Sequence, residues 1–173
     1  NYKVYENFLS GDLYLQIYEK LYSEHMPWFY YNTSVNDVTT DQFMFAHVMY
    51  NDGIGINSEL FADLLPLITK AATVSEHSSL LRVKSNLYTK THKTVEYAVH
   101  EDFKDLDSYT TCVYNLDSNN GYTKLFVNDK EEKIKRVANS LIVFNGKTMH
   151  CGATQTDSKT SVLINLDFNT YGA

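Results

Sequence analysis

The first part of the chain has apolar residues at helical spacing in two stretches that flank a predicted strand. Residues 12–25 carry Leu, Ile and Tyr at this spacing, which predicts an amphipathic helix. Residues 58–72 show the same pattern, with Ser58 as a candidate N-cap and Pro66 as a predicted kink or break. Between them, the run QFMFAHVMY at residues 42–50 predicts a buried strand. The N-terminal region therefore predicts two helices and one strand.

From residue 79 onward the pattern changes to short segments that alternate or are continuously apolar. They are rich in Val, Ile, Thr and Tyr and are separated by turn residues such as Asn145-Gly146, which predicts β-strands. The predicted strands are SLLRVKSNLYTKT, TVEYAVH, SYTTCVYNL, YTKLFVN, KIKRVA, SLIVFNG and TSVLINLDF. This order indicates a mostly β fold, with N-terminal helices packed on one sheet of a sandwich or jelly roll. We expect a single domain over residues 1–173, with 1–78 as a helical and strand support region and 79–173 as the jelly-roll core.

Composition and charge narrow the classes of partner. The formal net charge is -6, which argues against nucleic acid as an obligate partner, because phosphate binding needs a concentrated basic surface. The charged run at residues 130–136 predicts a solvated turn and strand face. No stretch is long and apolar enough to span a membrane, and no signal-peptide pattern opens the chain. Cys112 and Cys151 form no CxxC pair, and we interpret both as reduced, buried thiols of a cytoplasmic protein.

His100 and Asp102 are separated by one residue at the end of a predicted strand. Positions i and i+2 of an extended chain face the same side, so both side chains can converge on one point while Glu101 points away. His150, which follows the strand SLIVF and a turn, is the best candidate for a third ligand. Two imidazoles and one carboxylate make the facial triad of non-haem Fe(II) oxygenases. The HxD pattern also arises by chance, so a structural role stays open.

Beyond His150, Lys159 and Ser161 supply a cation and a hydroxyl on one face of a predicted strand. A lone lysine in a strand is usually solvated, but beside the apolar run VLINL we expect Lys159 to point inward. A buried cation can receive a carboxylate through a charge-assisted hydrogen bond of about 1.5–3 kcal/mol. Asn165 shares the strand parity of these residues. It is a candidate to contact the substrate or the surroundings of the metal, and the alternative is a strand-edge position.

Together, these segments resemble the prolyl 4-hydroxylase-like branch of the 2-oxoglutarate- and Fe(II)-dependent oxygenases, and especially the short members carried by marine bacteriophages. The resemblance covers residues 82–168 well and the rest loosely, including KVYENFLS near the start. The segments that carry it are RVKSNLYTKT, HED, TTCVYNLDSNNGYTKLF and VANSLIVFNGKTMHCGATQTDSKTSVLINLDF. The resemblance implies a double-stranded β-helix with a catalytic iron between its sheets, held by His100, Asp102 and His150.

The resemblance also implies contacts for the co-substrate. Lys159 matches the basic residue that receives the C5 carboxylate of 2-oxoglutarate, and Ser161 completes a K-x-S variant of the family's R-x-S pattern. Tyr88 matches a tyrosine that contacts the co-substrate, and Tyr97 matches a pocket residue near the metal. For both tyrosines, a core or rim position is the alternative. Asn115 stands where some relatives have a second tyrosine, so it is a pocket candidate only.

The implied function is a dioxygenase that couples oxidative decarboxylation of 2-oxoglutarate to hydroxylation of a C–H bond. It would use Fe(II), 2-oxoglutarate and O2, with ascorbate as a candidate reductant. A prolyl residue of a peptide or protein is the favoured substrate, while an amino acid, a small metabolite or a modified nucleobase stays open. Residues 28–31 and 90–96 are candidates to face it, although core packing is the alternative for the aromatic residues 28–31.

Two other functions stay open from the sequence. One is a jelly-roll binding module that does no chemistry and leaves Lys159 exposed. The other is a cupin-like enzyme that uses Mn or Zn and consumes no 2-oxoglutarate. If the chain is phage-encoded, we expect it in the host cytoplasm.

Overall fold

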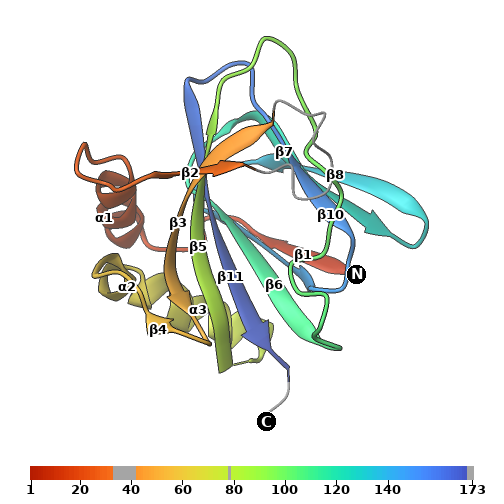
Figure 1. Ribbon diagram of the computed structural model, residues 1–173, viewed down its shortest axis with the longest axis horizontal. Coiled ribbons are helices and arrows are strands. Elements are labelled where there is room, and N and C mark those ends of the chain that lie inside the picture. Colours follow the sequence, from red (N-terminus) through yellow and green to blue (C-terminus); the bar gives the residue numbers. More distant parts are fainter. Residues whose placement is uncertain (33–41, 78, 171–173) are drawn as a thin grey trace.

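The computed structural model describes residues 1–32, 42–77 and 79–170 and consists mainly of antiparallel β-strands (Figure 1). One eight-stranded sheet has the order β1-β9-β6-β11-β5-β3-β2, with β4 paired to β3, and a three-stranded sheet has the order β10-β7-β8. The strands are β1 (Tyr2–Tyr5), β2 (Phe29–Asn32), β3 (Phe43–Asn51), β4 (Gly55–Ile56), β5 (Ser79–Thr89), β6 (Tyr109–Asn115), β7 (Asn119–Val127), β8 (Lys130–Arg136), β9 (Ser140–Asn145), β10 (His150–Ala153) and β11 (Thr160–Asn169). The helices are α1 (Gly11–Leu21), α2 (Leu60–Asp63) and α3 (Leu65–Ser75).

From β5 onward the chain passes back and forth between the two sheets. β5, β6, β9 and β11 lie in the eight-stranded sheet, whereas β7, β8 and β10 form the other. The segment between β5 and β6 joins β10 through two isolated bridges, Glu96 with Ala153 and His100 with His150. This alternation is the jelly roll, or double-stranded β-helix, and the predicted mostly β fold class is confirmed.

Both predicted helices are present with different bounds, and α3 extends to Ser75, beyond the predicted end at residue 72. α1 ends at Leu21, so residues 22–25 lie outside it. The second predicted helix is divided close to Pro66, because α2 ends at Asp63 and α3 begins at Leu65. Pro66 lies in the first turn of α3, where the missing N–H leaves no helical hydrogen bond unmade.

Five parts of the strand prediction differ from the structure. The segment TVEYAVH was expected as a strand, but it follows an irregular path and pairs only at Glu96 and His100. The predictions also lack β1, β2, β4 and β10, which pair with β9, β3, β3 and β7 respectively. β1 and β2 have four residues each, which is too short for periodicity to identify them.

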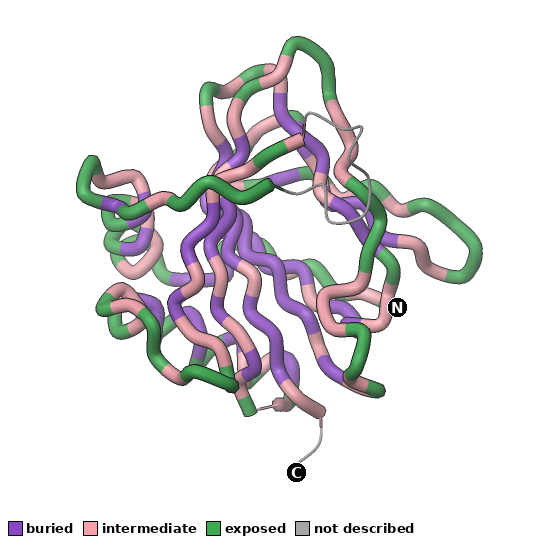
Figure 2. The backbone as a smooth tube through the Cα atoms, viewed as in Figure 1, coloured by how far each residue is buried: buried purple, intermediate pink, exposed green. Residues whose placement is uncertain are grey.

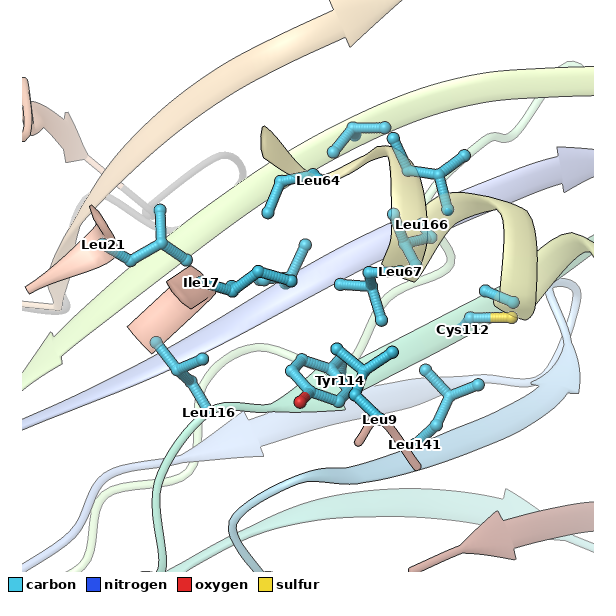
Figure 3. Packing of buried hydrophobic residues seen from close by; sticks show 14 of the residues in the cluster. Leu9, Ile17, Leu21, Leu64, Leu67, Cys112, Tyr114, Leu116, Leu141 and Leu166 are labelled. Carbon is cyan, nitrogen blue, oxygen red and sulfur yellow. The ribbon is translucent and has the colours of Figure 1, made fainter. Parts of the chain in front are cut away.

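The helices cover one face of the eight-stranded sheet and enclose the larger of two apolar clusters (Figures 1 and 3). This cluster joins Ile17 and Leu21 of α1 and Leu67 of α3 to Leu166 of β11. Each such buried side chain contributes about 1.5–3 kcal/mol. A smaller cluster lies between the two sheets, and the long strands are buried along much of their length (Figure 2). Its members are Tyr88, Val113, Leu125, Ile142, Phe144 and Leu163.

Both cysteines are free and buried, as predicted. Burial raises the pKa of the Cys151 thiol to about 11, so this thiol is neutral at physiological pH. No helix within the described ranges is long and apolar enough to cross a bilayer.

Candidate metal centre

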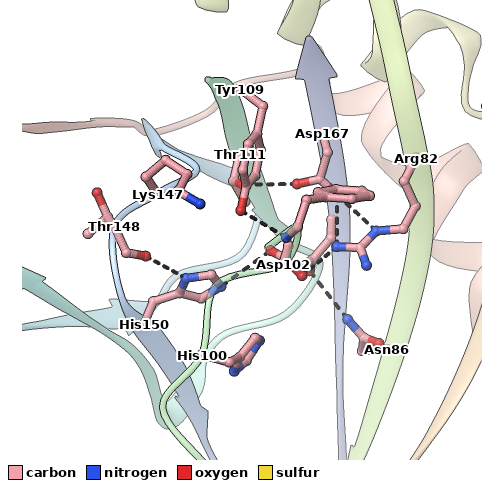
Figure 4. A network of polar contacts seen from close by, with 12 residues as sticks. Arg82, Asn86, His100, Asp102, Tyr109, Thr111, Lys147, Thr148, His150 and Asp167 are labelled. Atoms are coloured by element: carbon pink, nitrogen blue, oxygen red, sulfur yellow. Dashed lines mark hydrogen bonds and ion pairs between the residues drawn. The ribbon is translucent and has the colours of Figure 1, made fainter. Parts of the chain in front are cut away.

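His100, Asp102 and His150 meet at one point, as predicted (Figure 4). One ligand atom from each lies within 4.8 Å of the others. His100 and His150 are neighbours across a bridge, where each backbone N–H donates to the other's carbonyl oxygen at 2.9 Å. Glu101 turns away and pairs with Lys147 at 2.7 Å. As predicted from the HxD spacing, His100 and Asp102 converge while Glu101 points away, although the segment is not a regular strand.

Hydrogen bonds to the backbone orient both imidazoles. Nδ1 of His100 lies 2.9 Å from the carbonyl oxygen of Ala98, and Nδ1 of His150 lies 2.9 Å from that of Thr148. An Nδ1–H that donates to a carbonyl leaves Nε2 with its lone pair available to a metal. Both rings therefore present a ligand nitrogen to the same point.

Asp102 turns one oxygen towards a cation and the other towards the histidines. Its Oδ1 accepts a hydrogen bond from Nη2 of Arg82 at 2.5 Å. Its Oδ2 is buried, lies 3.4 Å from Nε2 of His150 and has no hydrogen-bond partner among the described residues. An unpartnered buried carboxylate oxygen is unfavourable, and a divalent cation would remove that penalty. The two nitrogens and this oxygen therefore fit a metal ion.

The charges around the centre favour the protonation states that metal ligands need. Burial alone would raise the pKa of Asp102, but the Arg82 guanidinium and the nearby His150 hold it well below its usual range. Burial lowers the pKa of His100. Burial would also lower the pKa of His150, but Asp102 raises it. A bound metal would take the place of that proton.

Arg82 bonds two carboxylates at once (Figure 4). Its Nε donates to Oδ2 of Asp167 at 2.9 Å, and its Nη2 donates to Asp102. Asp167 is fully buried on β11, and its Oδ1 accepts a hydrogen bond from Thr111 at 2.9 Å. The sequence reasoning missed Arg82 and Asp167. An acidic residue within the apolar run VLINLDF is the available signal, because a buried charge requires a partner.

Lys159 does not point inward, and that expectation is wrong. The residue is exposed in the bend before β11, which begins at Thr160. Lys159 therefore lies outside the strand, and the alternation of side chains along β11 does not place it on the same face as Ser161. Ser161 is fully buried and pairs in register with Tyr88, so these two side chains share a face.

A buried cation lies instead at Arg136, at the end of β8. It is 2% exposed, and its Cζ lies 4.7 Å from the centroid of the Tyr88 ring. Its Nη1 donates to Oγ of Ser161 at 3.0 Å and to Oε1 of Gln155 at 3.4 Å. Its Nε and Nη2 are buried without a hydrogen-bond partner in the described part of the chain. The prediction of a solvated face for residues 130–136 is therefore wrong for Arg136.

A buried guanidinium with unused donors can receive an anion. Burial lowers the pKa of Arg136, but a guanidinium stays protonated at neutral pH. Gly152 leaves room beside it, because a Cβ there would lie 3.1 Å from Tyr88 Oη and 3.7 Å from Arg136 Nη2. No local signal in KIKRVA separates Arg136 from its charged neighbours, so the sequence alone did not identify it.

The two predicted pocket tyrosines contact each other. The rings of Tyr88 and Tyr97 lie 5.1 Å apart between centroids in an edge-to-face arrangement. Tyr88 is buried against Arg136, whereas Tyr97 is half-buried and donates its hydroxyl to the carbonyl oxygen of Phe43 at 2.8 Å. Their contacts with a co-substrate stay predictions.

Asn115 and Asn165 lie on different strands of the large sheet. Asn115 is fully buried, donates to Ser140 Oγ at 3.0 Å and pairs in register with Leu163, so it faces the space between the sheets. Asn165 is half-buried and accepts a hydrogen bond from Asn86 at 3.3 Å. Asn86 projects from β5 on the side of His100 and Asp102 (Figure 4). Their roles as pocket residues stay predictions.

No protein-family model and no curated protein matches the sequence. Solved structures do match it. A prolyl-4-hydroxylase from Pseudomonas putida covers 97% of this chain and 92% of its own, at 14% identity and a TM-score of 0.69. A Trichoplax adhaerens prolyl hydroxylase in complex with a hypoxia inducible factor peptide fragment covers 97% and 83%, at 16% identity and a TM-score of 0.64.

A third structure is the epimerase SnoN from nogalamycin biosynthesis, in complex with Fe3+, alpha ketoglutarate and nogalamycin RO. It covers 97% of this chain and 78% of its own, at 12% identity and a TM-score of 0.64. At such low identities, these three matches show a shared fold. The chain therefore has the jelly-roll fold of 2-oxoglutarate- and Fe(II)-dependent oxygenases.

Proposed function

We propose that this protein is an Fe(II)- and 2-oxoglutarate-dependent oxygenase that hydroxylates a C–H bond. The observation that carries the proposal is the set of three donors at His100, Asp102 and His150, all within 4.8 Å of one another. Two oriented imidazoles and one buried carboxylate oxygen match the facial triad of non-haem Fe(II) oxygenases. When bound, Fe(II) supplies the redox chemistry that joins O2 consumption to conversion of 2-oxoglutarate into succinate and carbon dioxide.

In this proposal, Arg136 receives the far carboxylate of 2-oxoglutarate in place of Lys159. Its Nε and Nη2 are the unused donors, and Tyr88 and Ser161 hold the guanidinium in position. A buried cation is effective because the carboxylate meets it in a medium of low dielectric. One of the matched structures supports this co-substrate, since SnoN was solved in complex with alpha ketoglutarate.

The substrate favoured by the sequence resemblance is a prolyl residue of a peptide or protein. Two of the matched structures are named as prolyl hydroxylases, and one contains a peptide fragment. The SnoN complex contains nogalamycin RO, so a small-molecule substrate is the alternative. In either case Asn86 and Asn165, beside the metal centre on β5 and β11, would offer hydrogen bonds to the substrate. Residues 90–96 stay a candidate substrate loop.

A binding module without chemistry predicts that Lys159 is exposed, and Lys159 is exposed. That alternative gives no reason for a buried arginine with unused donors or for a buried carboxylate oxygen without a partner. We therefore favour the oxygenase. A phage origin and a cytoplasmic location stay predictions from the sequence.

The test is succinate formation from 2-oxoglutarate under air, with added Fe(II) and ascorbate. We expect slow turnover by the wild type without a primary substrate. Asp102→Ala should reduce it by more than about 100-fold, since even partners outside the ligand set change metal sites by 10–100-fold. The matched control is Asp105→Ala, which removes an exposed carboxylate from the same segment and should keep the turnover. A wild type that neither binds 2-oxoglutarate nor forms succinate would reject the proposal.

The cupin-like alternative gives a different result in the same assay. An enzyme of that type would bind Mn or Zn at the three ligands without consuming 2-oxoglutarate. Metal binding that Asp102→Ala abolishes, in a protein that forms no succinate and binds no 2-oxoglutarate, would favour this alternative.

A further inference from the structure

Arg82, Asp167 and Thr111 lie on one rung across three adjacent strands of the large sheet. β11 pairs Asp167 with Arg82 of β5 on one side and with Thr111 of β6 on the other. Both neighbours donate a hydrogen bond to the Asp167 carboxylate, at 2.9 Å each. Because the three strands are central in the sheet, this rung has little freedom to move.

Asp102 has no comparable support from its own backbone. It lies in a bend of an irregular segment rather than in a strand. The two histidines are oriented by carbonyl groups two residues away in their own segments. For Asp102, a hydrogen bond from Arg82 holds one carboxylate oxygen, and the other oxygen has no hydrogen-bond partner among the described residues and lies 3.4 Å from Nε2 of His150. The orientation of this carboxylate therefore depends on the rung.

We propose that Arg82, anchored by Asp167 and Thr111, is a positioning residue that holds Oδ1 of Asp102 and leaves Oδ2 as the single metal-ligand oxygen. The inference rests on the metal centre of the proposed function. The ring of Phe103, one residue beyond Asp102, lies 4.9 Å from the Arg82 guanidinium and gives the same contact a second anchor. Arg82 acts through Asp102 and does not itself contact the metal.

The direction in which metal affinity changes when Arg82 is removed distinguishes a positioning role from a simple charge effect. A guanidinium repels a divalent cation, so by charge alone the removal of Arg82 should tighten metal binding. Positioning predicts the opposite, a loss of about 10–100-fold in metal affinity, as is typical of groups that orient ligands.

The chain offers a matched control in Lys84. It lies two residues from Arg82 on the same strand, so it faces the same side, and its ammonium lies over the Tyr31 ring at 4.4 Å. It makes no hydrogen bond or ion pair with Asp102 or with any other carboxylate of the described residues. Lys84→Met therefore removes a nearby positive charge without removing the contact to Asp102.

The test variant is Arg82→Met combined with Asp167→Asn, which removes one positive and one negative charge, so charge alone predicts little change in metal affinity. The single change Arg82→Met would leave the buried Asp167 charge unpaired and threaten folding, whereas removal of both charges is better tolerated. Arg82→Lys provides a second variant that keeps the charge but loses the planar fork that reaches both carboxylates. Thermal unfolding of each variant verifies that the protein is folded.

The measurement is the affinity for Co(II), with the visible absorption of the bound ion as a report on ligand geometry. We expect the double variant to bind about 10–100-fold more weakly with a changed spectrum, Arg82→Lys to lie between it and the wild type, and Lys84→Met to bind equally or more tightly. Binding by the folded double variant or by Arg82→Lys that is as tight as in the wild type, with an unchanged spectrum, would overturn the positioning role. A wild type that binds no Co(II) would instead reject the metal centre itself.

Discussion

The metal centre and the Arg136 pocket lie in the same space between the sheets, but they are built differently. The proposed metal ligands come from an irregular segment and from the first residue of β10. Arg136, Tyr88 and Ser161 come from regular strands, and two of these strands belong to the large sheet while β8 belongs to the small one. Local spacing therefore brings together two of the three proposed metal ligands, whereas the Arg136 pocket is made entirely by the approach of two sheets.

This difference explains why the residues of the proposed metal centre could be predicted from the sequence, whereas the buried cation could not. Two metal ligands are separated by one residue, so their convergence follows from chain geometry alone. The buried cation was expected at Lys159 and is found at Arg136, because burial depends on which strand faces which. Sites assembled within one segment can be predicted, whereas sites assembled across sheets need the structure.

The largest expected effect in this comparison is the loss of 2-oxoglutarate affinity when Arg136 is replaced. Arg136→Met should weaken 2-oxoglutarate binding about 10–100-fold, because a charge-assisted hydrogen bond contributes about 1.5–3 kcal/mol. The matched change Lys159→Met removes an exposed cation and should alter the affinity by less than about 2-fold. Calorimetric titration of the Mn(II)-loaded protein measures both. A larger effect at Lys159 than at Arg136 would reverse the assignment.

The same substitution separates binding from stability. Within the described part of the chain, Arg136 forms no ion pair with a carboxylate, so its buried charge disfavours folding. Arg136→Met should therefore keep or raise the Tm while it weakens 2-oxoglutarate binding. A large fall in Tm would indicate that the guanidinium is structural.

An intermediate effect, on stability and on Co(II) binding, is expected at Gly146, which packs closely against Tyr109 near the proposed metal centre. A Cβ at Gly146 would lie 2.0 Å from a ring carbon of Tyr109, whose hydroxyl oxygen accepts the N–H of Phe103, next to Asp102. Gly146→Ala should destabilise the protein by about 1–3 kcal/mol through this overlap and weaken Co(II) binding. Gly11→Ala is the control, because nothing lies within 4 Å of a Cβ at Gly11. Equal Tm values for the two variants would contradict the expectation.

The smallest effect concerns the attachment of the metal-bearing segment to the small sheet. Glu96 accepts hydrogen bonds from Lys124 and Tyr122, both at 2.5 Å, and these hold the pKa of Glu96 at about 2. A carboxyl whose pKa is lowered on folding stabilises the protein above its unfolded pKa of about 4.5 and loses that contribution as pH falls towards 2. Glu96→Gln should therefore be less stable than the wild type at pH 7, and the two should converge between pH 4.5 and 2.

Urea unfolding across this pH range measures the convergence. Glu132→Gln is the control, because this half-buried carboxylate on β8 forms no ion pair with another residue in the described part of the chain. Its stability should follow that of the wild type at every pH. A difference between Glu96→Gln and the wild type that stays constant down to pH 2 would exclude the ion-paired carboxylate as its source.

Much of the fold was predictable because it follows from local periodicity. The division of the second helix close to Pro66 follows from the missing N–H of proline, and most of the strands after residue 79 follow from alternation and turn residues. The segment before His100 has a strand-like sequence but pairs only at two positions. Whether this segment forms a regular strand depends on the strands beside it in the folded protein, and the local sequence pattern carries no information about them.

The sequence by itself determined the mostly β architecture and the approach of His100 to Asp102, since both depend on spacing over a few residues. Tertiary structure alone decided that His150 joins these two residues, that Arg136 is buried against Tyr88 and that Arg82 reaches both Asp102 and Asp167. The physical reason is that burial and pairing arise when strands far apart in the chain become neighbours. That register is a property of the whole sheet and of no single segment.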